Sequence, residues 1–193
     1  MELAIVGLLV FTLFLAMFEF GLLFRDNLTA TDAIADAARI GAIVGPDTSP
    51  AGATADYEIV KAVREGLSAM DDTAIETIVV FKAAGTGADP ESQVPDQCLG
   101  GTSVNGVCNV YEARTAFAAV EFGNYDYFTC DVAGEVSCHW DPVKRTDGPQ
   151  PSDVETVGVY VRIAKDGYTG LFADSWTITR ASTMRLEPGV TEP

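Results

Sequence analysis

The chain has 193 residues, a formal net charge of -16 and a positive mean hydropathy of +0.17. Its 28 acidic residues against 12 basic ones argue against sequence-independent binding to nucleic acid, which needs Lys and Arg to displace phosphate counterions, and disfavour attraction to anionic lipid headgroups. A positive hydropathy in so acidic a chain requires the apolar residues to be concentrated in one segment, which leaves about 170 residues for a single folded domain.

The apolar residues gather between Leu3 and Phe24, where 18 of 22 residues are apolar. A helix of that length spans about 33 Å, which is enough to cross the hydrocarbon core of a bilayer. Apolar residues then recur at helical spacing as far as Val44, before the stop signal Gly45-Pro46. The pattern predicts one continuous helix within residues 1–45. Its first half is apolar all round, and its second half is amphipathic with a small-residue face that lets a sheet approach closely.

Two acids interrupt the apolar segment, Glu2 at its start and Glu19 near its far end. An ionisable group at the depth of Glu19 is costly in a membrane. Glu19 is therefore either a functional site or close enough to the boundary, near Arg25, to be partly solvated. The segment lacks the basic start and the small-residue cleavage site of a secretory signal peptide, so its own features are not those of a cleavable signal.

Residues 46–193 are predicted to form a single extracytoplasmic, acidic α+β domain. A turn-rich connector over 47–52 leads to a second helix over about 55–69, with Thr54 as its N-cap. Segment 112–122 fits a helix and a strand equally well. β-Branched residues and period-two alternation predict strands at 77–81, 107–111, 157–163 and 176–186. These elements predict the long helix packed on an antiparallel sheet of about four strands.

Four cysteines fall as two close pairs in long irregular regions of the chain. In an exported domain we expect two local disulfides, although the sequence alone allows three connectivities. The alternative is a zinc site that uses the second pair and His139, but adjacent ligands without a C-x2-C spacing give poor tetrahedral geometry. The expected pairs are Cys98 with Cys108 and Cys130 with Cys138.

The sequence carries no recognisable catalytic motif. His139 is the single histidine, and neither a nucleophile elbow nor a metalloprotease helix motif occurs. We therefore expect no enzymatic activity, no cofactor and no metal.

Two weaker signals occur elsewhere in the sequence. Asn124, Asp126 and Asp131 could offer oxygen ligands to calcium, but they lack EF-hand spacing, and a solvated acidic loop is favoured. The formal glycosylation sequon at Asn27 lies at the membrane boundary inside a helix, where we do not expect a glycan.

Three stretches of the N-terminal segment form a recognisable pattern: the opening Met-Glu-Leu-Ala-Ile-Val, the ending Phe-Glu-Phe-Gly at 18–21 and the stretch from Thr31 to Gly41. In these stretches the segment resembles the TadE-like pseudopilins of the tight-adherence (Tad) branch of type IV pili. The resemblance covers about the first 45 residues and implies a pilin-like fold. Scattered matches to the longer actinobacterial-type members follow at 108–111, 157–162, 169–172 and 184–188.

The resemblance also implies how the N-terminus is processed and used. Family members are prepilins whose short basic leader is cut after a glycine by prepilin peptidase, leaving a glutamate near the fifth mature position. Here the glutamate is second, so the sequence either begins inside the mature chain or is processed differently. In pilins this carboxylate compensates the free amino terminus of a neighbouring subunit, because two charges in an apolar bundle must pair or one must neutralise. We expect that role for Glu2, with a solvated terminus as the alternative.

The function implied is that of a structural subunit of a Tad-type pilus on the cell surface, serving adhesion. The chain would polymerise with copies of itself through its N-terminal helix, with Glu2, Gly7, Glu19 and Gly21 as assembly residues. Before assembly it would lie in the cytoplasmic membrane, with its C-terminal domain outside, and meet the pilus assembly machinery. The alternatives are a minor tip or priming pseudopilin, and a single-pass, membrane-tethered binding module that never polymerises.

Overall fold

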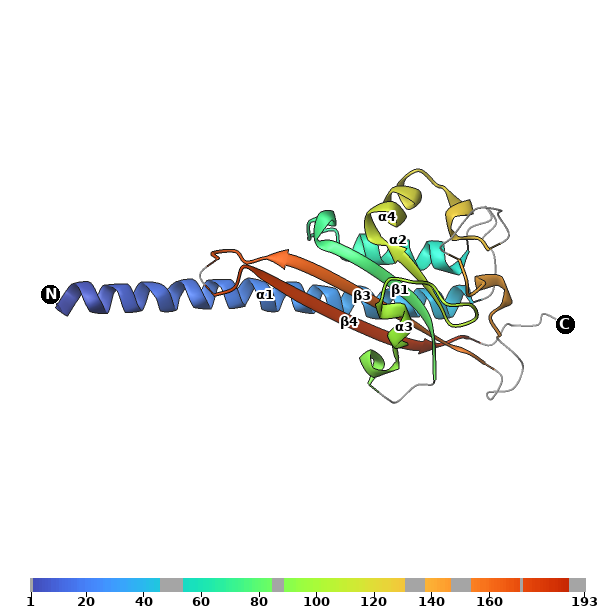
Figure 1. Cartoon of the computed structure of the whole chain (residues 1–193), viewed down its shortest axis with the longest axis horizontal. Coiled ribbons are helices and arrows are strands. Elements are labelled where there is room, and N and C mark those ends of the chain that lie inside the picture. The colour runs from blue at the N-terminus through green and yellow to red at the C-terminus, as the bar shows by residue number, and fades with distance from the viewer. Residues whose placement is uncertain are drawn as a thin grey trace.

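The computed structural model describes residues 2–45, 54–84, 89–130, 138–146, 154–170 and 172–187, with side chains from residue 6 onward. A long N-terminal helix carries a folded head on its second half (Figure 1). The predicted connector over 47–52 and the side chains of Glu2 and Asp131 lie outside what the structure describes.

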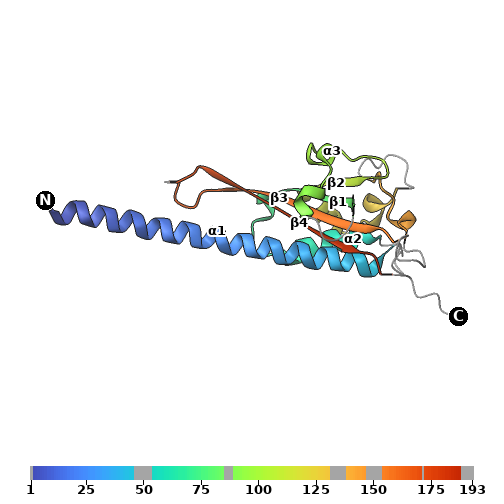
Figure 2. The ribbon, with the colours of Figure 1, turned by 90° about the horizontal axis from the view of Figure 1, so that it is seen from below.

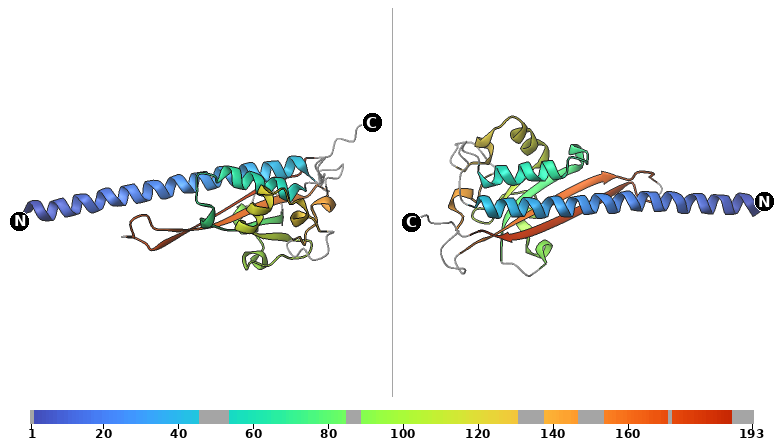
Figure 3. Two further views of the ribbon diagram at one scale, coloured as in Figure 1. Left: turned by 90° about the horizontal axis from the view of Figure 1, so that it is seen from above. Right: turned by 180° about the vertical axis from the view of Figure 1, so that it is seen from behind.

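Helix α1, Glu2–Val44, confirms the predicted continuous helix. Its first half projects away from the head, whereas its second half lies along the sheet, as the view from behind shows (Figure 3). The residues that α1 buries in the head recur at helical spacing and are mostly small: Ala30, Ala33, Ile34, Ala37, Ala38 and Ala42. The two halves of one helix therefore have different surroundings.

Helix α2, Ala55–Gly66, packs beside α1 and ends three residues earlier than its apolar pattern predicted. A glycine on each helix permits the close approach. A Cβ added at Gly41 would lie 2.6 Å from Ile59 Cδ1, and one added at Gly66 would lie 2.6 Å from the Cβ of Ala33. Thr54 is the N-cap residue, but its hydroxyl donates to the carbonyl oxygen of Phe128 at 3.3 Å and does not cap the helix.

The sheet has four antiparallel strands in the order β2-β1-β3-β4, which confirms the predicted α+β fold. In the register of the central strands, Val79 of β1 lies between Val110 of β2 and Tyr160 of β3. The strands are β1 Ile75–Ala83, β2 Cys108–Glu112, β3 Thr156–Asp166 and β4 Ser175–Arg185.

Each face of the sheet covers a separate apolar cluster. The larger cluster lies against α1, α2 and α4, Ala113–Glu121. Segment 112–122, which the sequence left open, is therefore helical except at its two end residues. The smaller cluster lies on the opposite face under the short helix α3, Asp96–Leu99, and Figure 2 shows α3 across the sheet from α1. Short 3-10 turns complete the fold at Asp72–Ala74, Pro90–Gln93, Tyr125–Phe128 and Pro142–Lys144.

The β3–β4 hairpin extends beyond the other strands. It runs from the head along α1 toward the projecting half of the helix (Figures 1 and 2). The two strands pair continuously from Thr156 with Arg185 to Asp166 with Ser175. The turn of this hairpin therefore lies against α1 outside the main body of the head, and it defines one part of the site described next.

Candidate functional site

The projecting half of α1 exposes nearly all of its apolar side chains. Met17 is 78% exposed and Leu8 is 68% exposed, whereas Ile34 in the docked half is fully buried. Among the described residues, α1 is the one helix long and apolar enough to contain a membrane span, by length and composition. Apolar surface of this extent is far larger than a soluble monomer normally exposes. Its large exposed members are Val6, Leu8, Leu9, Val10, Phe11, Leu13, Phe14, Met17, Phe18, Phe20 and Phe24.

Two glycines in this half are not required by any contact inside the subunit. A Cβ added at Gly7 or Gly21 would meet nothing within 4 Å, in contrast to Gly41 and Gly66 of the docked helices. Glycine inside a helix costs about 1 kcal/mol relative to alanine. No contact among the described residues therefore accounts for a glycine at either position.

Glu19 is fully buried although it belongs to the projecting, exposed half of α1. The hydroxyl of Thr169, in the turn of the β3–β4 hairpin, donates a hydrogen bond to its Oε2. The second carboxylate oxygen, Oε1, is buried without a partner among the described residues and lies 3.3 Å from where a Cβ of Gly167 would be. The hairpin turn therefore covers this carboxylate, and Glu19 is not solvated beside Arg25, which was one of the two interpretations of its sequence position.

The base of the same turn is held by Asp26, which is 2% exposed. Its Oδ2 accepts hydrogen bonds from Lys165 Nζ at 2.6 Å and from the Tyr168 hydroxyl at 2.8 Å, while its Oδ1 pairs with Arg25 at 3.0 Å. Partial burial lowers the pKa of Lys165, but its hydrogen bonds to Asp26 and Tyr168 outweigh that effect and raise the pKa above its usual 10.5. Lys165 is thus a fixed cation that ties β3 to α1.

Aromatic packing and one arginine complete the contact between hairpin and helix. Phe20 lies 6.1 Å from Phe172 and 6.0 Å from Trp176, measured between ring centroids. Further along β4, Arg180 donates from Nε to the side-chain oxygen of Asn27 at 2.9 Å. Asn27, the residue of the glycosylation sequon, is therefore engaged within the subunit. Contacts at Glu19, Phe20, Asp26 and Asn27 fasten the hairpin along more than two helical turns of α1.

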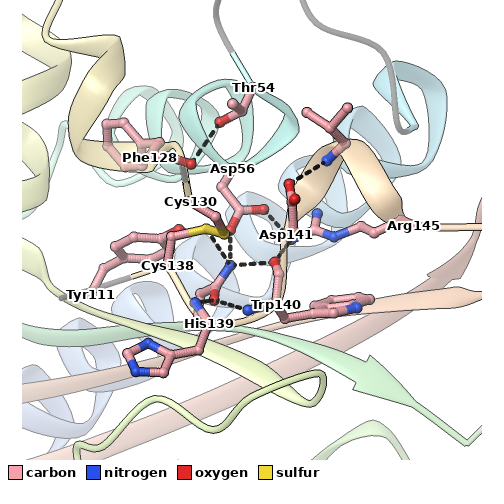
Figure 4. Close-up of polar contacts among 12 residues, drawn as sticks. Thr54, Asp56, Tyr111, Phe128, Cys130, Cys138, His139, Trp140, Asp141 and Arg145 are labelled. Carbon is pink, nitrogen blue, oxygen red and sulfur yellow. Dashed lines mark hydrogen bonds and ion pairs between the residues drawn. A yellow bond between two sulfur atoms is a disulfide. The ribbon is translucent and has the colours of Figure 1, made fainter. Parts of the chain in front are cut away.

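A second polar cluster lies inside the head, at the start of α2 (Figure 4). Asp56 is fully buried. Its Oδ2 accepts hydrogen bonds from Asn109 Nδ2 and from the Tyr111 hydroxyl, both at 2.7 Å, and its Oδ1 pairs with Arg145 Nη2 at 2.5 Å. Burial, followed by the nearby Asp56 carboxylate, raises the pKa of Tyr111 well above its usual 10.0. The phenol therefore stays protonated as a donor.

Asn109 extends this cluster to the segment before β3. Its Oδ1 accepts from the backbone N–H groups of His139 and Trp140, each at 2.6 Å, and its Nδ2 donates to the Trp140 carbonyl at 2.8 Å. The Arg145 guanidinium lies 4.0 Å from the centre of the Trp140 ring. Because the contacts of Asp56 and Asn109 join segments far apart in sequence, the cluster braces the head and does not form part of the α1 surface.

Both expected disulfides are present. Cys98 joins Cys108, which connects α3 to β2, and Cys130 joins Cys138 beside the Asp56 cluster. The first pair is fully buried, whereas both residues of the second are partly exposed. The second pair is thus committed to a disulfide and not to zinc, and the described residues contain no group of three or more His, Cys, Asp or Glu that could hold a metal ion.

Sequence reasoning singled out Glu2, Gly7, Glu19 and Gly21, and all four lie on the projecting half of α1. It missed the residues that cover Glu19, because Thr169 is 150 positions away and a lone threonine in a turn carries no signal for such a contact. It also missed the pairing of Asp56 with Arg145. The only local signal at Asp56 is that of an acid in the first turn of a helix, where the helix dipole favours negative charge.

Comparison with known proteins gives one match. The sequence model described as TadE-like protein matches residues 1–39, which include the projecting half of α1 and much of the docked half. No curated protein and no solved structure matches the chain. The match confirms the resemblance found in the sequence and indicates a pilin-like protein associated with Tad pili.

Proposed function

We propose that this chain, with its TadE-like N-terminal helix, is a structural subunit of a Tad-type pilus that polymerises through the projecting half of α1. The observation that carries the proposal is the difference between the two halves of one helix. The second half packs against its own head, while most apolar side chains between Val6 and Phe24 form an exposed surface, which the hairpin turn contacts near Glu19 and Phe20. Such a surface needs either a membrane or copies of itself.

The proposed sequence of events uses both of these environments. Before assembly the segment lies in the cytoplasmic membrane with the head outside. Passing from lipid to a filament core brings little hydrophobic gain, because lipid chains are as apolar as leucine, so close packing has to drive the transfer. Gly7 and Gly21, which no contact in the subunit requires, would let neighbouring helices approach each other.

Glu2 has a separate role in this proposal. Its carboxylate would pair with the free amino terminus of a neighbouring subunit, since a lone charge in an apolar bundle is costly. Glu2→Ala is expected to leave the subunit in the membrane but to reduce the amount of filament. A normal filament yield from this variant would remove Glu2 from the assembly mechanism.

The acidic head is proposed to face outward along the filament and to contact the surfaces to which the cell adheres. Its excess of acidic residues keeps neighbouring filaments apart through charge repulsion. The Asp56 cluster and the two disulfides support this role, because they brace a head that works outside the cell.

The central test is substitution of the two glycines in the organism that makes the protein. Gly7→Leu and Gly21→Leu keep the segment apolar, and a Cβ at either position meets nothing within 4 Å in the subunit, so membrane insertion should be unchanged. If these glycines contact neighbouring helices, protein in material sheared from the cell surface should fall about tenfold. Val10→Leu, at an exposed position of the same segment, is the matched control and should have little effect. Unchanged sheared protein from both glycine variants would contradict polymerisation through this surface.

The membrane fraction and the material sheared from the cell surface also distinguish the alternative functions, a tethered binding module and a minor pilus subunit. Recovery of the wild-type chain only from membranes would favour a tethered binding module. Recovery from sheared filaments at a few copies per filament, measured by quantitative mass spectrometry, would favour a minor tip or priming subunit over the bulk subunit.

A further inference from the structure

We propose that the turn of the β3–β4 hairpin is an interfacial membrane anchor, which enters the outer headgroup region of a lipid bilayer beside α1 and covers Glu19 there. The inference rests on the proposed membrane-inserted stage of the chain. It adds a second lipid-contacting element and identifies its partner as the surface of a bilayer.

The depth of the turn follows from its contacts with α1. Thr169 bonds to Glu19, and Phe172 and Trp176 pack against Phe20. Phe20 lies four residues inside the end of the apolar segment, which corresponds to about 6 Å along a helix. Any position of α1 that brings this segment into a bilayer therefore brings the hairpin turn to the same level. A depth of about 5–10 Å is typical of elements that lie in the interface.

The residues of the turn suit that layer. Tyr168 and Phe172 are 39% and 44% exposed, and Trp176 packs on the helix between them and the head. Tyrosine and tryptophan are enriched at both membrane–water boundaries, where an apolar ring and a polar edge are both accommodated. The exposed ring of Phe172 lies beside Phe20, which is itself exposed on the apolar segment.

The turn also explains how an acid is tolerated at this level of the helix. A carboxylate inside a bilayer is costly unless it is paired or shielded. In this structure Glu19 receives the Thr169 hydroxyl and is fully buried beneath the turn, so the carboxylate faces protein and not acyl chains. A turn that stayed in water could not keep lipid away from Glu19.

Charged residues limit how deep the turn can go. Asp166 and Asp174 at its base are exposed, and Lys165 is held by Asp26. A non-helical turn also leaves backbone groups that cannot remain unpaired in hydrocarbon. The turn should therefore stop among the headgroups. Because these charges do not form a basic patch, the attraction is apolar and should not need anionic lipid.

The two tryptophans provide the test. The full chain is reconstituted into zwitterionic phosphatidylcholine vesicles whose acyl chains carry bromine near the carbonyl end, since bromine quenches nearby tryptophan. Trp140→Phe leaves Trp176 at the hairpin as the emitter, and Trp176→Phe leaves Trp140, which is 5% exposed inside the head. We expect Trp176 emission to fall about twofold relative to unbrominated vesicles, as for an interfacial residue, and Trp140 emission to be unchanged.

A third reporter separates this inference from the proposed function. Phe14→Trp in a chain that lacks both native tryptophans places the emitter about 15 Å inside the end of the apolar segment, where Phe14 is exposed. Its quenching is therefore measured in vesicles that carry bromine near the methyl end of the acyl chains. Quenching at position 14 without quenching of Trp176 would overturn the interfacial anchor and leave membrane insertion of α1 intact. Absence of quenching at both positions would overturn the membrane-inserted stage itself, and the anchor with it. If Trp140→Phe fails to fold, the difference in quenching between wild type and Trp176→Phe measures the same quantity.

Discussion

Asp56 and Arg145 form an ion pair with an Oδ1 to Nη2 distance of 2.5 Å, and both side chains are fully buried. The pair joins the first turn of α2 to the segment before β3, 89 residues further along the chain. Asn109 and Tyr111 of β2 donate to the same carboxylate. Three parts of the head therefore meet at one buried acid, and this arrangement has consequences that stability measurements can detect.

Removing the arginine should destabilise the head strongly. Arg145→Met leaves the Asp56 carboxylate buried without its cation, and the loss should be about 3–5 kcal/mol in the free energy of unfolding. The matched control is Arg162→Met, which breaks a pair with Glu76 in which both side chains are about half exposed, and it should cost less than about 1 kcal/mol. Denaturant unfolding of the full chain in detergent micelles, followed by near-ultraviolet circular dichroism, measures both. Equal losses of unfolding free energy in the two variants would show that the buried pair stabilises the head no more than the exposed pair does.

Alkaline pH should weaken the same cluster through Tyr111. Its pKa is raised above the usual 10.0 in the folded head, chiefly by burial. The unfolded chain therefore releases this proton at a lower pH than the folded chain does. The contribution of protonated Tyr111 to the stability of the folded head is therefore fully present below about pH 10, and it is lost as the pH rises above that value.

Tyr111→Phe tests that dependence. The variant should lose about 1 kcal/mol at neutral pH, because one hydrogen bond to Asp56 disappears, and its stability should fall less steeply than wild type above pH 10. Unfolding curves measured at pH 8 and pH 10.5 give the comparison. An identical decline in variant and wild type would assign the alkaline loss to other groups, since Tyr57 and Tyr160 also have raised pKa values.

The packing of Gly158 predicts an intolerance to any side chain. A Cβ at this position of β3 would lie 2.2 Å from the Phe81 ring on the neighbouring strand, so Gly158→Ala should cost about 1–3 kcal/mol in unfolding free energy. Phe81→Leu removes the obstructing ring, and the double variant should lose less than the sum of the two single changes. Gly7→Ala, where nothing lies within 4 Å, serves as the glycine control and should cost nothing. Strict additivity of the first two changes would contradict the predicted contact.

The two disulfides should differ in their response to reductant. Cys98 and Cys108 are fully buried, while Cys130 and Cys138 are partly exposed, and thiol–disulfide exchange requires access of the attacking thiolate. Mild reduction of the native chain followed by alkylation should label the second pair first, and the first pair should need denaturant. Peptide mass spectrometry identifies the labelled residues. Labelling of Cys98 and Cys108 at the same rate would indicate that the α3 region opens readily.

Much of the fold could be predicted from local patterns. The helix to Val44 followed from uninterrupted apolar periodicity and a Gly-Pro stop, and the strand over 157–163 followed from clear alternation. The secondary structure of segment 112–122 could not be predicted, because a short apolar run fits both a helix and a strand. Packing against neighbouring elements determines which of the two forms. In the head the segment forms α4, whose inward side chains pack against α2 and β1.

The exposed apolar surface of the projecting half of α1 could be predicted for the same reason, because it depends on composition along one helix. Glu19 shows where this reasoning stops. The sequence identified it as an acid in an apolar segment, but its two interpretations could be separated only by what lies beside it. Thr169 reaches it because β3 and β4 extend past the rest of the sheet.

The sequence by itself determined that one segment is too apolar for water and that the rest is acidic, with α+β patterning and two close pairs of cysteines. These properties follow from composition and from periodicity over neighbouring residues. Only the tertiary structure decided that a distant hairpin turn shields Glu19 and that Asp56 pairs with Arg145. These contacts depend on segments up to 150 residues apart, and no local pattern encodes a pairing that forms only when strands and helices pack.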